Sequence, residues 1–105
     1  MKHFRIITDK ELKKLLEGPR PPILIDVRDN DEFCKGHIKT SKNIPIEDFE
    51  DAIKKMKLNN NAIIVVYCKT GKSSLIACNI LKDLGFKKIY NFRGIDNWHY
   101  KLKCN

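Results

Sequence analysis

Apolar and polar positions divide the chain into short continuous apolar runs and longer segments with helical spacing. The longest apolar run covers residues 62–68, is mostly β-branched, and lies between an asparagine-rich stretch and a loop that contains a glycine. Such a run predicts a strand buried on both faces, as in a parallel sheet. The next segment predicts a helix to about Leu84, with one buried face formed by Ile76, Ala77, Ile80, Leu81 and Leu84.

Further strands and helices are predicted on both sides of this unit. Strands are expected within residues 4–7, 23–27, 41–45 and 86–91, and helices at 8–17, within 28–36, at 46–57 and in a final turn or two at 94–100. The first helix begins with Thr8 and Glu11, which form a capping box. This alternation predicts a single α/β domain over residues 1–105, with three α/β/α layers and a central, mostly parallel five-stranded sheet.

The chain's most reactive candidate, Cys68, follows directly after the central apolar run. It is expected at the carboxyl end of a strand, which is where open α/β sheets bind their ligands. Gly71 allows a tight loop whose N–H groups point inward, and Lys69 and Lys72 flank that loop. Lysines and a helix amino terminus stabilise a thiolate, so this loop fits a cysteine nucleophile.

The loop has a second interpretation, because an anion-binding loop or an inert cysteine at a strand end has the same local pattern. Ser73 or Ser74 is expected to start the following helix and to cap it, and either role is compatible with both interpretations. Residues 68–74 taken alone therefore leave nucleophile and anion cradle equally open.

Composition and charge narrow the choice of partners. The chain has 105 residues, an apolar share of 42% and a formal net charge of +8. Its basic residues are mostly lysines spread along the whole sequence, which predicts a solvated surface rather than a nucleic-acid or membrane site. Without a signal peptide, a transit segment or a long apolar run, the chain is expected to be cytoplasmic. Since no feature of the sequence indicates an obligate dimer, a monomer is expected.

The four cysteines show neither C-x-x-C pairs nor zinc-ligand spacing with the histidines. We therefore expect no metal site and, without a secretion signal, no disulfide framework. Cys34 and Cys104 are expected to be incidental, and Cys78 is not expected to act as a resolving thiol.

Several motifs around Cys68 occur together and in a fixed order. They are Ile25-Asp26-Val27-Arg28, Glu32-Phe33, Gly36-His37-Ile38, Asn43-Ile44-Pro45, Val66-Tyr67-Cys68 with Gly71 and Ser73-Ser74, Gly85-Phe86, and Gly94-Ile95 with Trp98. From about residue 6 to residue 98 the chain resembles the single-domain form of the rhodanese (thiosulfate sulfurtransferase) superfamily.

The resemblance implies a sulfurtransferase with a persulfide intermediate, which needs no metal and no organic cofactor. Cys68 would take a sulfur from thiosulfate or a persulfide donor and pass it to cyanide or to a thiol such as glutathione or thioredoxin. The loop that binds the substrate would consist of Lys69, Thr70, Gly71, Lys72, Ser73 and Ser74. A catalytically weak binding or regulatory module is the alternative. Phosphatase and arsenate reductase relatives are disfavoured, because they carry a longer loop and an arginine where this chain has Ser74.

Some positions depart from the family pattern. Lys69 and Ser73 stand where many members have arginine, which puts the preference for thiosulfate in question. Outside the loop, residues 39–41 replace Pro-Gly-Ala and Arg93-Gly94 replaces a double glycine, and both changes are expected to be tolerated.

Three residues outside the loop are expected to support the site. Asp26 and Arg28 are predicted to form an ion pair that bonds the active-site loop. His37 is predicted to fix a turn rather than to act as a base.

Overall fold

The computed structural model describes residues 4–104. Its strands are β1 (Arg5–Ile6), β2 (Ile23–Asp26), β3 (Lys42–Asn43), β4 (Ile63–Cys68) and β5 (Lys88–Gly94). Its α-helices are α1 (Asp9–Glu17), α2 (Asn30–Lys35), α3 (Phe49–Met56) and α4 (Lys72–Asp83). Two short 3₁₀ helices, η1 (Ile46–Asp48) and η2 (Ile95–Asn97), complete the element order.

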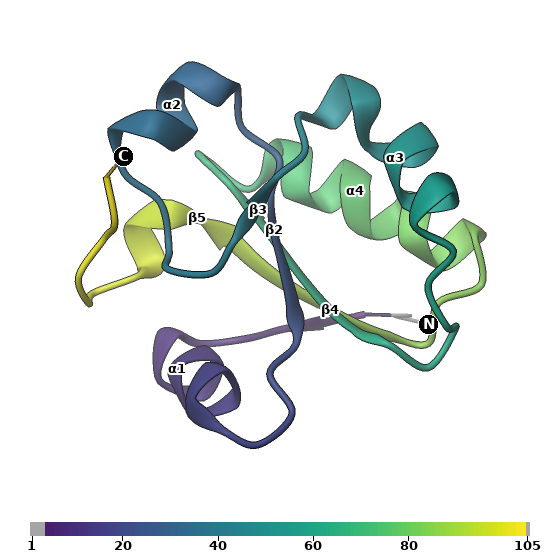
Figure 1. Cartoon of the computed structure of the whole chain (residues 1–105), viewed down its shortest axis with the longest axis horizontal. Helices are drawn as coiled ribbons and strands as arrows, with labels where there is room; N and C mark the ends of the chain where they lie inside the picture. The colour runs from purple at the N-terminus through teal and green to yellow at the C-terminus, as the bar shows by residue number, and fades with distance from the viewer. Residues whose placement is uncertain (1–3, 105) are drawn as a thin grey trace.

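The five strands form one sheet in the order β1-β5-β4-β2-β3, and every pair of neighbours is parallel. The central strand β4 is the one formed by the long apolar run, and it pairs with β2 and β5 (Figure 1). The α/β class and the five-stranded sheet are therefore confirmed, and the sheet is parallel throughout.

Helices cover both faces of the sheet, so the three-layer arrangement is also confirmed. Side chains alternate along β4 because successive residues of a strand point to opposite faces. Ile64, Val66 and Cys68 belong to the apolar cluster that includes residues of α3 and α4, whereas Val65 and Tyr67 face the cluster beneath α1. In Figure 1, α1 lies on one side of the sheet, and α3 and α4 lie on the other.

Local sequence signals account for several helix boundaries. The Thr8 hydroxyl accepts the N–H of Glu11 at 3.2 Å, and the Glu11 carboxylate accepts the N–H of Thr8 at 2.9 Å, so the capping box is confirmed. Gly85, with φ at 95°, ends α4 in the left-handed conformation that favours glycine. The predicted helix over residues 46–57 starts as a 3₁₀ turn, and the final predicted helix is reduced to η2.

The prediction for one face of α4 was wrong at its amino-terminal end. Ile76 is 53% exposed, although its spacing with Ala77 and Ile80 suggested burial. The helix rests on one side of the sheet, and its fully buried side chains are Ser74, Ala77, Cys78 and Leu81. Apolar residues cover more of the helix surface than the sheet can bury.

The end of the described chain returns to the segment before β3. Lys103 forms an antiparallel bridge with His37, in which each backbone N–H donates to the other residue's carbonyl oxygen, with nitrogen-to-oxygen distances of 2.9 and 2.8 Å. No helix within residues 4–104 is long and apolar enough to cross a membrane.

Candidate active site

Cys68 lies where its position in the sequence placed it, at the carboxyl end of the central strand. Its side chain is almost completely buried, with 3% exposure, and it forms part of the wall of a small cavity of about 160 Å³. The rest of that wall is formed by the β2–α2 turn, the first turns of α2 and α4, η1 and the loop after β4: Val27, Arg28, Asp29, Glu32, Ile46, Lys69, Thr70 and Ser73. The cavity therefore opens at the edge of the sheet where ligands of parallel α/β proteins bind.

The loop after Cys68 folds back over its sulfur. The backbone N–H of Gly71 donates to Sγ at 2.9 Å, and the N–H of Ser74 donates to it at 3.3 Å. Gly71 has φ at 102° and forms the N-cap of α4, so the helix dipole points its positive end at the same atom. Two N–H dipoles and a helix terminus stabilise negative charge on Sγ or on a sulfur attached to it.

The two serines do not cap the helix, so this part of the sequence-based prediction was wrong. α4 begins at Lys72 and its N-cap, Gly71, has no side chain. Ser73 lines the cavity, whereas buried Ser74 donates its hydroxyl proton to the carbonyl oxygen of Gly71 at 3.1 Å. Ser74 thus braces the loop from inside the first helical turn.

Gly94, at the end of β5, is a part of the site that sequence reasoning underestimated. A Cβ atom at this position would lie 2.6 Å from the carbonyl oxygen of Lys69. The register of β5 against β4 shifts between Val66 and Tyr67, and this irregularity brings Gly94 opposite Cys68. The close contact explains why glycine occupies this position, which was identified only as part of a family motif.

The residue before it, Arg93, is outside the loop in sequence, as expected, but its side chain lies beside Gly71. A Cβ atom at Gly71 would lie 3.4 Å from the Cβ of Arg93. Arg93 has φ at 70°, and Thr40, at the other departure from a family glycine, has φ at 75°. Both substitutions therefore place a side chain in a left-handed conformation that glycine adopts more easily.

Charges at the cavity are mixed rather than purely basic. Lys69 lines the cavity, but its ammonium lies 3.9 Å from the Glu32 carboxylate, and Asp29 lines the same space. Lys72 is exposed and is not among the residues that line the cavity. Of the two lysines predicted to attract an anion, only Lys69 is at the cavity, and a carboxylate faces it.

The expected ion pair between Asp26 and Arg28 is present and buried. Arg28 donates to both carboxylate oxygens at 2.7 to 3.1 Å and also donates to the carbonyl oxygen of Gly36 at 2.7 Å. Burial alone would lower the pKa of Arg28, but the hydrogen bonds and charge of Asp26 outweigh it and raise the pKa. The pair fixes the β2–α2 turn that forms one wall of the cavity.

The same pair does not bond the active-site loop, contrary to the prediction. Within residues 4–104 the Asp26 carboxylate accepts hydrogen bonds only from the backbone N–H and the guanidinium of Arg28. The turn after β2 is instead joined to the end of β4 by a backbone hydrogen bond, in which the N–H of Val27 donates to the carbonyl oxygen of Tyr67 at 3.0 Å.

Tyr67, the residue before the cysteine, anchors the opposite side of the strand and was not singled out from the sequence. Its hydroxyl accepts the N–H of Ile38 at 3.0 Å and lies 3.0 Å from the hydroxyl of Ser41. Burial raises the pKa of Tyr67, and the charge of Asp26 adds to this effect. A buried tyrosine in an otherwise aliphatic strand was the available signal.

His37 has the structural role that was predicted for it. Its Nδ1 lies 2.9 Å from the carbonyl oxygen of Phe33, and its ring stacks on that of Phe33 with 3.8 Å between centroids. It is not among the residues that line the cavity of Cys68.

The other cysteines have different environments. Cys34 and Cys104 are exposed, whereas Cys78 is fully buried in the apolar cluster that also contains Cys68. Burial, together with the nearby Cys68, raises the pKa of Cys78 to about 12. Cys78 therefore stays protonated at neutral pH and lacks access to a substrate. Within residues 4–104, no group of three or more His, Cys, Asp or Glu residues is placed to hold a metal ion.

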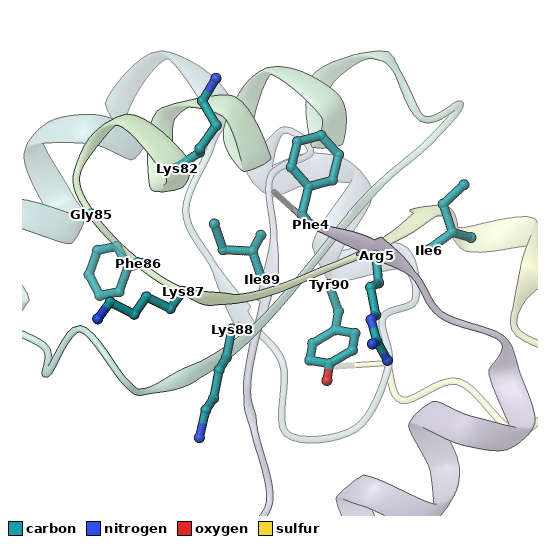
Figure 2. Close-up of a pocket in the computed structure, with 10 residues that line it drawn as sticks. All are labelled: Phe4, Arg5, Ile6, Lys82, Gly85, Phe86, Lys87, Lys88, Ile89 and Tyr90. Atoms are coloured by element: carbon teal, nitrogen blue, oxygen red, sulfur yellow. The ribbon is translucent and has the colours of Figure 1, made fainter. Parts of the chain in front are cut away.

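A larger groove of about 960 Å³ lies at the opposite, amino-terminal end of the central strands (Figure 2). Its walls carry four basic side chains, which are Arg5, Lys82, Lys87 and Lys88. In Figure 2 these side chains point in different directions rather than toward one point. The groove contains no cysteine, and Cys68 is at the other end of β4.

The fold and the site together define a class: a parallel α/β protein with a cysteine cradled by backbone N–H groups at the amino terminus of a helix. Comparison with known proteins identifies the family within that class. The family model of the rhodanese-like domain matches residues 8–101, and this chain belongs to the rhodanese-like family, whose relatives include sulfurtransferases.

Relatives and solved structures agree with this assignment. A mitochondrial protein of Schizosaccharomyces pombe, provisionally named a thiosulfate sulfurtransferase, is 38% identical over 88% of this chain and 73% of its own length. A rhodanese-like domain protein from Staphylococcus aureus has a TM-score of 0.83 at 29% identity, covering 100% of this chain and 99% of that one. A human single-domain sulfurtransferase has a TM-score of 0.73 at 27% identity, covering 83% and 87%.

Proposed function

We propose that this protein carries sulfur on Cys68, accepting it from thiosulfate or a persulfide donor and passing it to cyanide or a thiol. The observation that carries the proposal is the pair of N–H groups, from Gly71 and Ser74, that point at Sγ. They would hold the terminal sulfur of a persulfide by electrostatic preorganisation, because their dipoles are already oriented before any charge arrives.

The reaction consists of two displacements on sulfur. The Cys68 thiolate attacks the outer sulfur of thiosulfate, the sulfur–sulfur bond of thiosulfate breaks, and sulfite leaves with the electron pair. Cyanide or a thiolate then attacks the terminal sulfur of the Cys68 persulfide and the sulfur–sulfur bond of the persulfide breaks. Thiocyanate or a new persulfide is formed, and Cys68 leaves as the thiolate.

The geometry favours this activity over phosphoryl or arsenate transfer. Residues 69–74 contain no arginine. Arg28 lines the cavity, but its guanidinium is committed to Asp26 and to the carbonyl oxygen of Gly36. A bidentate clamp on a tetrahedral oxyanion therefore has no free arginine in the cavity wall.

A binding or regulatory module without activity is the other candidate, and kinetics separate it from a sulfurtransferase. Thiocyanate formation is measured while thiosulfate and cyanide are varied, and inorganic polysulfide replaces thiosulfate in a second series. A sulfur carrier gives parallel double-reciprocal plots with at least one donor, as ping-pong transfer requires. Absence of turnover with both donors would favour the binding module.

A further inference from the structure

An exposed apolar pair on α4 begins one helical turn from the mouth of the Cys68 cavity. Leu75 and Ile76 are 47% and 53% exposed. Ile76 follows Ser73, which lines the cavity, by three residues, and Leu75 follows Gly71 by four. Residues with these spacings are neighbours on a helix surface. The pair, named here the α4 patch, is therefore continuous with the active-site loop.

The placement of this pair distinguishes it from the other exposed apolar side chains. The remaining large ones among residues 4–104 are Ile6, Tyr100 and Leu102, none of which belongs to α4 or to the active-site loop. Isolated exposed apolar residues are ordinary on protein surfaces. Two adjacent ones beside a nucleophile form a contact surface that an incoming substrate would meet.

Unpaired positive charges flank the α4 patch. Lys72 precedes Ile76 by four residues, and Arg93 lies beside Gly71, the residue one turn before Leu75, where a Cβ added to Gly71 would meet the Arg93 side chain. Neither Lys72 nor Arg93 forms an ion pair with a carboxylate in residues 4–104. An apolar centre with a positive rim is complementary to an apolar surface with a negative rim.

We propose that the α4 patch docks the sulfur acceptor, and that this acceptor is an acidic protein whose reactive cysteine lies among apolar and acidic side chains. This inference rests on the proposed function of Cys68. The acceptor thiolate attacks the terminal sulfur of the persulfide, the sulfur–sulfur bond breaks, and Cys68 leaves as the thiolate while the acceptor becomes the persulfide.

Other occupants fit the patch less well. A small thiol such as glutathione reaches only the cavity mouth and leaves Leu75 and Ile76 in water. A second copy of this chain would bring together two chains with a formal charge of +8 each. The centre of the patch is aliphatic, whereas single-stranded nucleic acids are bound by aromatic side chains on which bases stack.

Docking is tested with a reaction that needs the Cys68 thiol but no persulfide. The exposed thiols are removed by Cys34→Ser and Cys104→Ser. Two peptides carry one cysteine among leucines, with glutamates in one peptide and lysines in the other, and each cysteine is activated as a mixed disulfide with thionitrobenzoate. Attack by Cys68 releases the coloured thiolate. We expect the acidic peptide to react about tenfold faster at low salt, with the difference shrinking at high salt.

Substitutions on two exposed isoleucines locate the docking surface. Ile76→Glu is expected to slow the reaction of the acidic peptide about tenfold. Ile6→Glu changes an equally exposed isoleucine, at 54%, beside the groove at the other end of the sheet and should leave this rate unchanged (Figure 2). Reaction with the small uncharged reagent dithiodipyridine reports the intrinsic reactivity of Cys68 and should be the same in all variants.

Equal rates for the two peptides, or equal losses in Ile76→Glu and Ile6→Glu, would overturn the docking surface. Persulfide formation on Cys68 is measured on the same proteins by intact mass. A protein that prefers the acidic peptide but takes up no sulfur would overturn the proposed function, and the acceptor's role with it. This result differs from failed docking, in which sulfur is taken up but the two peptides react at equal rates.

Discussion

The two ends of the central sheet carry concavities of opposite character. At the amino-terminal end lies a groove of about 960 Å³ with four basic side chains, and at the carboxyl-terminal end lies a cavity of about 160 Å³ with mixed charges. The larger one has more space and more positive charge, yet its cationic side chains diverge (Figure 2). The smaller one directs two backbone N–H groups at a single sulfur atom.

Under the proposed function, converging dipoles rather than volume or net charge locate the chemistry in this molecule. Backbone N–H groups held by a helix terminus are fixed in position, so they lose little conformational freedom when they bind an anion. Exposed lysines are mobile and hydrated, and each must be ordered before it contributes. The first test of the contrast removes the sulfur atom to which the dipoles point.

Replacing Cys68 has the largest expected effect. Cys68→Ala should reduce sulfur transfer by at least about 10³-fold, because no other described thiol has both access and N–H donors. Cys78→Ala is the matched control, since Cys78 is buried in the same cluster, and it should retain most of the activity. The measurement is the steady-state rate of thiocyanate formation. Comparable rates in Cys68→Ala and the wild type would contradict this account.

Distorting the loop without touching its own residues should have the next largest effect. Gly94→Ala places a methyl group 2.6 Å from the Lys69 carbonyl oxygen, so the loop must shift. We expect kcat/KM to fall about tenfold to a hundredfold and the free energy of unfolding to fall by about 1–3 kcal/mol.

Gly18→Ala is the control for this substitution, because its methyl group would meet its nearest neighbour at 3.4 Å and lies at the end of α1. Its kcat/KM should match that of the wild type. If Gly94→Ala loses stability but keeps full activity, the loop geometry is not what the reaction requires.

Removing a carboxylate from the cavity should have a moderate effect and should improve the use of thiosulfate rather than impair it. Glu32→Gln releases Lys69 from its ion pair and removes a negative charge from the path of an anionic donor. The KM for thiosulfate is expected to fall about two- to fivefold at low salt, with a smaller change at high salt because of screening. A KM that is unchanged or higher at low salt would show that Glu32 does not oppose the donor.

Reversing charge in the large groove should have the smallest effect. Lys87 and Lys88 line that groove at the far end of the sheet. The double variant Lys87→Glu and Lys88→Glu should change kcat/KM by less than about twofold at physiological salt, where the Debye length is about 8 Å. A large loss, with folding intact by circular dichroism, would make the groove part of the site.

Much of this organisation could be predicted from the sequence. The apolar run before Cys68 and the alternation of strands and helices predicted the fold, because periodicity and turn residues act locally. The glycine three residues after the cysteine indicated the loop. The contact of Gly94 with Lys69 could not be predicted in this way, because it joins residues far apart in the chain through an irregularity between β4 and β5.

The directions of the side chains near the start of α4 also could not be predicted from local sequence patterns. The serines were expected at the N-cap, but Gly71 occupies it. The buried side chains of α4 follow one face with spacings of three and four residues: Ser74, Ala77, Cys78 and Leu81. Ile76 lies about 100° around the helix axis from Ala77 and is exposed. Lys72 is also exposed and does not line the cavity.

The central claim is that Cys68 holds a persulfide, and intact mass tests it most directly. The Cys34→Ser and Cys104→Ser protein is incubated with thiosulfate, and separately with inorganic polysulfide, and is then freed of reagent before its mass is measured. We expect a gain of one sulfur atom that cyanide removes, and no gain after the further substitution Cys68→Ala. An unchanged mass with both donors, or the same gain without Cys68, would contradict it.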